Sequence, residues 1–201
     1  MRTEDDRHAK LAADRGRIAP VKLAHIVRRT SRLEEMIHWY ETVLAATVVH
    51  RDAMLAFLTY DDEHHRIAIA GIPGLEEQPA MAAGTDHVAF THADLGDLLN
   101  TYVRLKREGI EPYWCINHGP TTSMYYKDPD GNRVELQVDN YPTADETNRW
   151  IRSGDFAKNP IGVVFDPEEL VARYRAGEPM DQLITRPPLP DGAAPFSMLR
   201  F

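Results

Sequence analysis

The sequence predicts an α+β protein built from two copies of one strand–helix–three-strand (βαβββ) unit, followed by a C-terminal extension. The order of elements carries this prediction, because the same series occurs in residues 20–70 and again in residues 85–138. His25 and His87 occupy the same central place in the first strand of each unit. A repeat of this size indicates two similar units that close one sheet around a cavity, as an open barrel.

The first unit is predicted from the spacing of its apolar residues. A strand over 20–28 alternates apolar and polar residues, and a helix over 31–44 follows with apolar residues at helical spacing. Thr30 and Ser31 offer an N-cap for this helix, and Glu34 can close a capping box. The three further strands are expected at about 46–50, 53–60 and 65–70.

The second unit repeats this order after a loop over 71–84 that contains two prolines. Its first strand is expected over 85–91. Asp94 caps a helix over 94–108, which Gly109 ends. The remaining strands are expected at about 111–117, 122–127 and 132–138.

The last two strands form a hairpin whose polar face carries a carboxylate. Its turn is Asp128-Pro-Asp-Gly131, in which proline fixes φ and glycine supplies the left-handed position. On the strand after the turn, Glu135 shares one face with Arg133 and Gln137. The alternate residues are apolar: Val134, Leu136 and Val138. One face therefore enters a core while the other faces a cleft.

Length and composition limit the class of protein. The chain has 201 residues and is 43% hydrophobic, which suits one globular domain with extra segments. A net charge of −8 argues against nucleic acid or an anionic membrane as a partner. Cys115 is the single cysteine, so neither an internal disulfide nor a cysteine zinc site is expected. With a charged start and no long apolar run, we expect a cytoplasmic protein.

Two segments flank the domain expected at 20–140. Residues 1–19 are rich in charge and lack periodicity, so they form an N-terminal arm. The C-terminal extension, 141–201, contains two expected helices and then a proline-rich extended segment that wraps the surface. Trp150 and Phe156 are its candidate anchors. The helices are expected at 145–152 and 167–175, and the extended segment at 177–201.

Three residues at matching places form a candidate metal site. His25, His87 and Glu135 each lie on the polar side of an apolar strand, and a closed sheet brings them together. Two imidazoles and one carboxylate form the facial ligand set of non-haem Fe(II) oxygenases. The same ligands also suit Mn, Zn or Ni, so the residues alone do not choose the metal.

More polar aromatic side chains fall in the same region. His64 and His65 open the strand HHRIAIA, and His118 and Tyr125 lie on or beside the hairpin. A histidine near a metal can act as general acid or base, and a phenol can donate to a metal-bound oxygen. The alternative for His64 and His65 is that they are solvent-exposed residues at a strand edge.

Three segments together resemble a known family. DEHHRIAIAGIP, TDHVAF and HGPTTSMYYKDPDGNRVEL are similar to the type I extradiol ring-cleavage dioxygenases of the vicinal oxygen chelate superfamily. The resemblance covers about residues 20–140. The DPDGN turn is common to the superfamily, whereas HHRIAIA resembles the catechol-cleaving members. Because the chain has room for only one pair of units, it resembles the one-domain subgroup.

The resemblance implies an oxidoreductase that opens the ring of a catechol, such as one similar to 2,3-dihydroxybiphenyl, with O2 beside its two hydroxyls. It implies Fe(II), or alternatively Mn(II), held by His25, His87 and Glu135. It implies that His65 is the acid–base residue and that His118 and Tyr125 bind or polarise the catecholate. Strand alternation would group His65 with core residues, so a bulge or a late strand start is required, and His64 stays open as the alternative.

Two other functions are weighed against this one. A glyoxalase or thiol transferase would place a glutamate on the fourth strand, and the segment RIAIAG has none. A metal-free module that binds an aromatic drug normally lacks the complete ligand set. The shorter spacing between His118 and Tyr125 departs from the family pattern and leaves the role of His118 open. Because the second domain of larger members is missing, we expect a homodimer or higher homo-oligomer.

Overall fold

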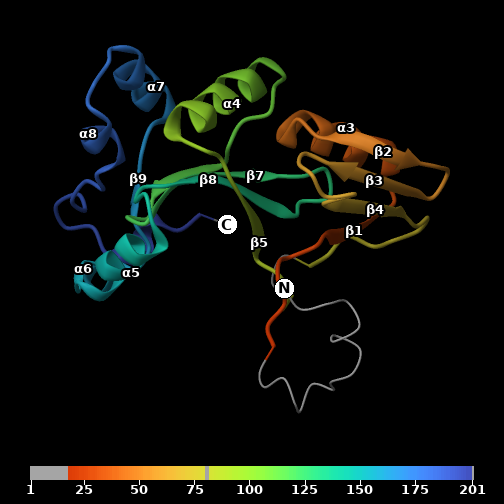
Figure 1. The fold of residues 1–201 in the computed structure, drawn as a ribbon, viewed down its shortest axis with the longest axis horizontal. Helices are drawn as coiled ribbons and strands as arrows, with labels where there is room; N and C mark the ends of the chain where they lie inside the picture. The colour runs from red at the N-terminus through yellow and green to blue at the C-terminus, as the bar shows by residue number, and fades with distance from the viewer. Residues whose placement is uncertain (1–17, 80–81, 201) are drawn as a thin grey trace, which may run out of the picture.

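The computed structural model describes residues 18–79 and 82–200. Figure 1 shows two sheets side by side, with helices α3 and α4 covering both from the same side. The predicted N-terminal arm falls almost entirely outside the described residues. The prediction of an α+β fold with two βαβββ units and a C-terminal extension is confirmed.

The first unit follows the predicted order with shorter strands. Its first strand, β1, pairs in parallel with its last, β4, and the sheet order is β1-β4-β3-β2. The predicted capping box is wrong, because Arg32 is the N-cap of α3 without a side-chain cap, and Thr30 Oγ1 instead accepts from the Arg32 amide. The elements are β1 Ile26–Thr30, α3 Leu33–Leu44, β2 Thr47–Arg51, β3 Leu55–Thr59 and β4 Ile67–Gly71.

The second unit repeats this topology. Strand β5 pairs in parallel with β8, and the sheet order is β5-β8-β7-β6-β9. Asp94 caps α4 as predicted, since its side chain accepts from the Asp97 amide, and Gly109 follows the helix with a φ of +75°. The elements are β5 His87–Thr91, α4 Leu95–Arg107, β6 Trp114–Asn117, β7 Thr121–Lys127 and β8 Arg133–Asp139.

One core joins the two units. The buried faces of α3 and α4 and the inner faces of both sheets form a single apolar cluster, which includes Tyr40, Leu98 and Val134. A polar bridge crosses the same region, because Arg28 Nε donates to the Tyr40 hydroxyl at 3.0 Å and that hydroxyl lies 3.2 Å from Asp128 Oδ2. This bridge ties β1 and α3 of the first unit to the hairpin turn of the second.

The expectation of one closed sheet is not met within a single chain. The described strands form two separate sheets, and β1 and β5 each end their own sheet. The packing of α3 and α4 and the Arg28–Tyr40–Asp128 bridge hold the units side by side. Alternation within a strand predicts which residues face the core, but it carries no information about the angle between two sheets.

The C-terminal extension packs on the second unit only in part as predicted. Its two helices are present, and strand β9 joins the second sheet beside β6. The segment expected to be extended contains two short helical elements, α8 and η1. The elements are α5 Ala144–Arg152, α6 Asp155–Lys158, β9 Val163–Val164, α7 Pro167–Arg175, α8 Met180–Ile184 and η1 Pro195–Met198. Within the described part of the chain, every helix falls short of the length and apolarity that crossing a bilayer requires.

Candidate functional site

The second unit brings two of the predicted metal ligands together. The parallel pairing of β5 and β8 sets His87 opposite Arg133 and Ala89 opposite Glu135. His87 Nε2 lies 3.1 Å from Glu135 Oε2, and the two side chains are 34% and 6% exposed. Two ligand atoms that each lie about 2.1 Å from one ion, at right angles, are ~3 Å apart. The spacing of this pair therefore fits a shared metal, with His87 as its accessible member.

Asp86 orients His87 from the other side of the ring. Its carboxylate lies 2.8 Å from His87 Nδ1 and 2.8 Å from Arg133 Nη1. The hydrogen bond with Glu135 raises the pKa of His87 to about 9, and Asp86 adds to this rise against the effect of burial. The sequence analysis missed Asp86, although a carboxylate beside a ligand histidine is a common supporting partner and DH is part of the TDHVAF segment.

Glu135 is a buried carboxylate that is held in its charged form. Burial raises its pKa, but hydrogen bonds with His87 and Ser123 outweigh this effect, so the net pKa shift is downward. Ser123 stands on β7, where alternation places it on the same face as Tyr125. An anionic carboxylate is the form that binds a metal ion, so this environment suits a ligand.

Tyr125 and His118 complete the polar cluster of the second unit. Tyr125 stands directly opposite Glu135 in the sheet, and its hydroxyl lies 3.0 Å from His118 Nε2. His118 Nδ1 donates to the Ile161 carbonyl, which leaves Nε2 of the neutral ring to accept from Tyr125. Burial lowers the pKa of His118, which favours that neutral form. The Trp114 ring packs on Tyr125 with centroids 4.6 Å apart.

The other predicted residues gather on the first unit. His25 is exposed just before β1, and its ring centroid lies 4.4 Å from that of His65. The His65 ring also stacks on Phe57 at 4.4 Å, and its Nδ1 lies 2.6 Å from His64 Nδ1. Because β4 begins only at Ile67, the late strand start required for His65 is observed. His65 therefore faces His25 while Ile67 is buried.

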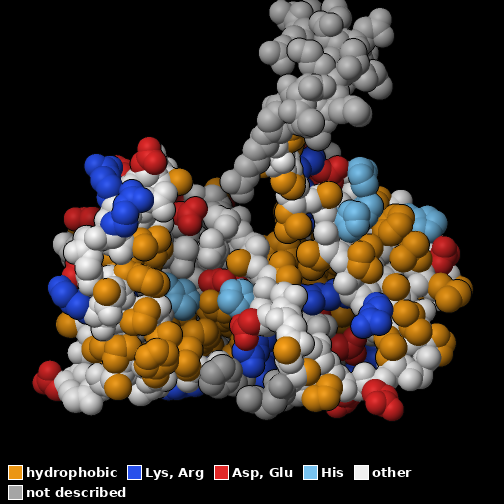
Figure 2. All heavy atoms as spheres, turned by 90° about the horizontal axis from the view of Figure 1, so that it is seen from below, with side chains coloured by type: hydrophobic (Ala, Val, Ile, Leu, Met, Phe, Trp, Pro, Cys, Tyr) orange, Lys and Arg blue, Asp and Glu red, His pale blue; other side chains and the backbone are white. Residues whose placement is uncertain are grey.

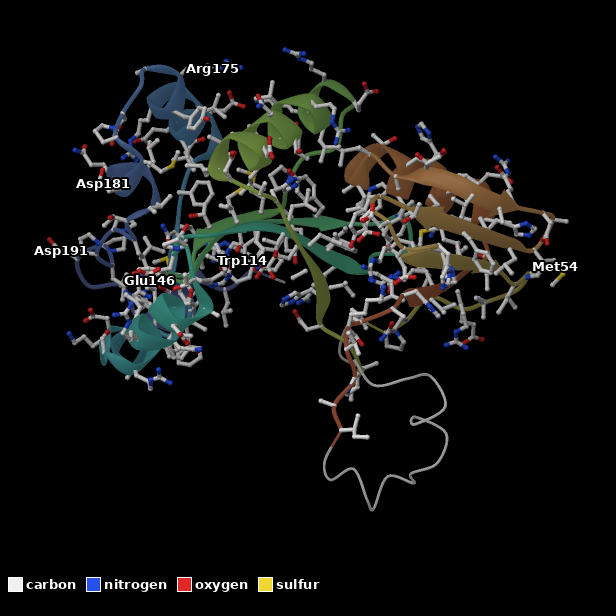
Figure 3. The ribbon with its side chains drawn as sticks, in the orientation of Figure 1. Met54, Trp114, Glu146, Arg175, Asp181 and Asp191 are labelled. Atoms are coloured by element: carbon white, nitrogen blue, oxygen red, sulfur yellow. The ribbon has the colours of Figure 1, made fainter. Side chains whose placement is uncertain are left out.

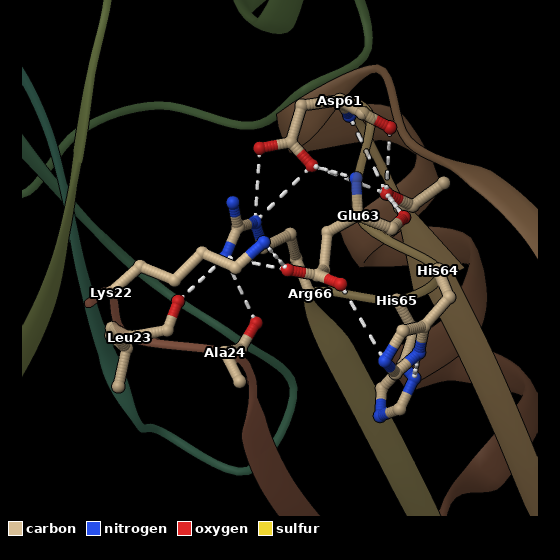
Figure 4. A network of polar contacts seen from close by, with 9 residues as sticks. Lys22, Leu23, Ala24, Asp61, Glu63, His64, His65 and Arg66 are labelled. Carbon is tan, nitrogen blue, oxygen red and sulfur yellow. Dashed lines mark hydrogen bonds and ion pairs between the residues drawn. The ribbon is translucent and has the colours of Figure 1, made fainter. Parts of the chain in front are cut away.

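Arg66 holds the segment that carries His25. Its guanidinium donates to the carbonyls of Leu23 and Ala24 at 2.5 Å and 3.0 Å (Figure 4). Its Nε donates to Asp61 at 2.9 Å, which fixes the side chain from the opposite end. Arg66, which directly precedes β4, thus positions Leu23 and Ala24, which precede β1. These contacts place His25 beside His65. Desolvation, together with the neighbouring His25 and His64, lowers the pKa of His65.

The predicted three-ligand site does not form within one chain. His87 and Glu135 meet on the second unit, whereas His25 lies with His65 on the first. Across residues 18–79 and 82–200, no three His, Cys, Asp or Glu side chains are close enough to hold one ion. Figure 2 shows the histidines of this face in two separate groups, one near acidic side chains at the centre and one toward the edge. In this structure His25 therefore lies apart from the other two proposed ligands.

A cavity of about 390 Å³ lies away from these residues, between the second sheet and the extension. Asn117, Phe165 and Leu183 line it, and it includes none of the histidines of the site. In Figure 3, Arg175 and Asp181 mark the extension, Trp114 marks the second sheet, and Met54 marks the far end of the first. The candidate chemistry therefore lies on the open face of the sheets and not in this cavity.

Comparison with known proteins shows the family of the chain. The family model "Glyoxalase/Bleomycin resistance protein/Dioxygenase superfamily" matches residues 22–136. The chain is 49% identical to "Biphenyl-2,3-diol 1,2-dioxygenase 2" of Rhodococcus globerulus over 83% of this chain and 88% of that protein. It is 45% identical to "Biphenyl-2,3-diol 1,2-dioxygenase 3" of the same organism over 82% and 88%.

A solved structure supports the fold alone. A putative glyoxalase from Bacillus halodurans has a TM-score of 0.51 and 17% identity, covering 59% of this chain and 96% of its own. The extension after about residue 140 lies outside the family model, whereas the matches to the two curated relatives cover most of the chain. The chain therefore belongs to the glyoxalase/bleomycin resistance protein/dioxygenase superfamily and, within it, to the one-domain extradiol dioxygenases.

Proposed function

We propose that the protein is an Fe(II)-dependent extradiol dioxygenase that acts on a catechol similar to biphenyl-2,3-diol. The ring opens beside the two hydroxyls, and both atoms of O2 enter the product. The observation that carries this proposal is the 49% identity to a biphenyl-2,3-diol 1,2-dioxygenase, which extends over 83% of the chain. The contact between His87 and the buried Glu135 on the second unit supports the metal part of the proposal.

The roles of the side chains follow from their surroundings. His87, Glu135 and His25 are the proposed ligands, of which the first two meet within one chain. The lowered pKa of His65 keeps its ring neutral near pH 7, so it can take up a proton from a catechol hydroxyl and return it later. This is the acid–base role that the resemblance implies, and the exposed position of His64 makes it the weaker candidate.

Tyr125 and His118 are proposed to act on the catecholate oxygens as a pair. The Tyr125 hydroxyl lies 3.0 Å from His118 Nε2, which can accept its hydrogen, and it also hydrogen-bonds with Glu135. Burial raises the pKa of Tyr125, and the charge of Glu135 raises it further, so the phenol keeps its proton at neutral pH. A protonated phenol beside a proposed metal ligand can donate to a substrate oxygen when that oxygen displaces His118 as its acceptor. His118 is then the residue that holds the donor in place.

Isotope labelling and iron dependence test the proposal together. The protein is purified without oxygen, loaded with Fe(II) and given 2,3-dihydroxybiphenyl in ¹⁸O2. We expect a yellow ring-opened product that carries both labelled atoms and forms only with iron. Incorporation of one labelled atom, or equal turnover after chelation of the metal, would contradict it. Parallel samples loaded with Mn(II) and Zn(II) test whether iron is required.

A further inference from the structure

We propose that the C-terminal extension fixes the tautomer of His118 and, through it, the direction in which the Tyr125 hydroxyl points its hydrogen. The positioning residues are in the loop over 159–162 and at Arg186. The inference rests on the proposed function, because Tyr125 and His118 are the pair proposed to act on the catecholate. It goes further by giving a part in the reaction to residues that lie after 22–136, the residues that the family model matches.

A backbone carbonyl of this loop decides which nitrogen of His118 carries the hydrogen. The Ile161 oxygen contacts His118 Nδ1, and because a carbonyl oxygen can only accept, Nδ1 is the donor. Burial lowers the pKa of His118, and in the neutral ring Nε2 then has no hydrogen and can only accept. Nε2 lies 3.0 Å from the Tyr125 hydroxyl, so the phenol is the donor of this pair.

The other tautomer would reverse that hydrogen bond. Nε2–H of His118 would donate to the Tyr125 oxygen, and Glu135, which also hydrogen-bonds with Tyr125, would be left as the acceptor of the phenol hydrogen. Hydrogen bonds to a charged carboxylate are stronger than those between neutral groups. A catecholate oxygen would then have to displace a charged carboxylate instead of a neutral ring. The observed tautomer therefore keeps the phenol hydrogen available to a substrate.

Gly162 lets the loop approach the end of β6 closely. A Cβ at this position would lie 2.4 Å from the Asn117 carbonyl oxygen and 2.9 Å from His118 Cα, and the backbone has a φ of +122°. Space and backbone conformation therefore both call for glycine. The next residue, Val163, pairs with Asn117 as the first residue of β9. This close approach brings the carbonyl of the preceding residue, Ile161, to the His118 ring.

Two polar side chains hold the loop in this conformation. Asn159 is buried, and its Oδ1 accepts from the amides of Ile161 and Gly162 at 3.2 Å and 2.9 Å. Its Nδ2 donates to the Gly162 carbonyl at 2.8 Å. Arg186 Nη1 donates to the carbonyls of His118 and Asn159 at 3.1 Å and 2.8 Å. One guanidinium nitrogen thus joins the residue whose tautomer is fixed to the loop that fixes it.

Nuclear magnetic resonance of the full-length protein measures the tautomer directly. The histidines are labelled with ¹⁵N, and Zn(II) replaces Fe(II) because it is diamagnetic and keeps the signals sharp. Ring nitrogens with and without a hydrogen differ in ¹⁵N chemical shift and in their coupling to the ring hydrogens. His118→Phe identifies the signals of His118 by removing them. We expect hydrogen on Nδ1 in the wild-type protein, and hydrogen on Nε2 alone would overturn the inference.

Gly162→Ala tests whether the loop is the cause. The added Cβ forces the Ile161 carbonyl away, so we expect both tautomers to appear. In the Fe(II)-loaded protein kcat should fall by about 10²-fold, the loss that a misplacement of about 1 Å far from the chemistry can cause. Gly192→Ala is the matched control, because its φ is +77° and nothing lies within 4 Å of the added atom. It should keep the wild-type tautomer and kcat.

A second variant covers the case in which Gly162→Ala does not fold, as judged by circular dichroism. Arg186→Gln then takes its place, because it removes the donor to the carbonyls of His118 and Asn159. Arg200→Gln is its control, since Arg200 donates to carbonyls near the end of the extension. A folded variant that loses turnover while His118 keeps hydrogen on Nδ1 alone would overturn the inference.

A double-variant cycle separates action through His118 from a general loss of structure. In His118→Phe there is no tautomer left to fix, so adding Gly162→Ala should lower the reduced kcat little further. Losses that multiply in full would show that the loop acts without His118, and they would overturn the inference.

Failure of this inference is distinct from failure of the proposed function. A wild-type protein that opens the catechol ring, but whose His118 carries its hydrogen on Nε2, keeps the function and loses only the inference. A wild-type protein that does not turn over the catechol with Fe(II) loses both together.

Discussion

The two βαβββ units have the same strand order, yet their site residues lie in opposite surroundings. On the first unit His25 and His64 are exposed, and His65 is only partly covered by Phe57. On the second unit Glu135 and Tyr125 are buried, and His87 is partly open to solvent. The second unit therefore holds a buried, charged carboxylate, whereas the first unit presents its histidines to solvent.

The extension packs against the second unit. The Ile161 carbonyl, within the extension, accepts from His118, and Arg186 Nη1 donates to the His118 carbonyl at 3.1 Å. Arg186 also lies over the Trp150 ring at 4.9 Å, and the expected anchor Trp150 packs at Gly119. These contacts join the extension to residues 118–119 of the second unit. The buried carboxylate therefore lies in the unit that the extension reinforces.

The largest effect is expected from Glu135→Ala. Removing the only carboxylate of the proposed set should lower iron affinity by more than the roughly 10–100-fold that loss of an outer partner costs. Turnover should disappear while circular dichroism stays unchanged. Gln137→Ala, two residues along the same face, is the control and should keep its iron. Full iron occupancy in Glu135→Ala would remove this residue from the ligand set.

His65→Phe tests the catalytic share of the first unit. The substitution keeps an aromatic ring that can stack on Phe57 but cannot carry a proton. We expect iron and catechol binding to persist while turnover falls by about 10²–10⁴, the usual contribution of an acid–base group. His64→Phe is the matched control. Unchanged turnover in His65→Phe would move the role to His64 or His118.

Asp86→Asn tests the support of His87 on the second unit. The amide removes the charge that binds His87 Nδ1 and Arg133, both at 2.8 Å. We expect iron affinity to fall about 10–100-fold, which is less than for Glu135→Ala. Competition with a coloured chelator measures the change, and Asp139→Asn on the exposed end of β8 serves as the control. Equal iron affinity in the two variants would leave Asp86 without a part in the site.

Gly119→Ala tests whether the extension stabilises the second unit. A Cβ at Gly119 would lie 2.2 Å from Trp150 Cη2, and the backbone there has a φ of +100°. Gly177→Ala is the matched control, because its φ is +76° and nothing lies within 4 Å of the added atom. We expect Gly177→Ala to cost about 1 kcal/mol in urea unfolding and Gly119→Ala about 1–3 kcal/mol more. Equal losses would mean that Trp150 moves without cost.

The smallest effect concerns the thiol of Cys115 in β6 of the second unit. Burial raises its pKa to about 12, so the folded protein keeps the thiol neutral. The unfolded thiol ionises near its usual pKa of 9.0, and stability from this group is therefore present below pH 9 and lost as pH rises toward 12. Iodoacetamide at about pH 8 should modify Cys115 only after unfolding, as followed by mass spectrometry. Rapid modification of the folded chain would show that β6 is accessible.

The sequence predicted most of what lies within a single element. Alternation along β8 correctly placed Val134 in the core and Glu135 on the polar face. It did not predict how the two sheets are placed, because that depends on α3 packing against α4 and on the Tyr40–Asp128 contact. His87 and Glu135 therefore lie together in the structure, as predicted, whereas His25 lies beside His65 on the first unit.

Local errors have equally local causes. The predicted capping box with Glu34 is absent because Arg32 is the N-cap of α3. The Thr30 hydroxyl accepts a hydrogen bond from the Arg32 amide instead. The short helical elements of the extension carry weak periodicity, so the sequence predicts extended chain where α8 is found. The late start of β4 was required by the role of His65 and is found at Ile67.

Strand β9 has a consequence for the exposed edge of the second sheet. Its residues Val163 and Val164 pair with Asn117 and Ile116 on the outer side of β6, so the backbone groups there are already used. An open strand edge at that place would let chains add to one another without limit. Because β9 is only two residues long, it leaves a very short strand edge in place of the edge of β6.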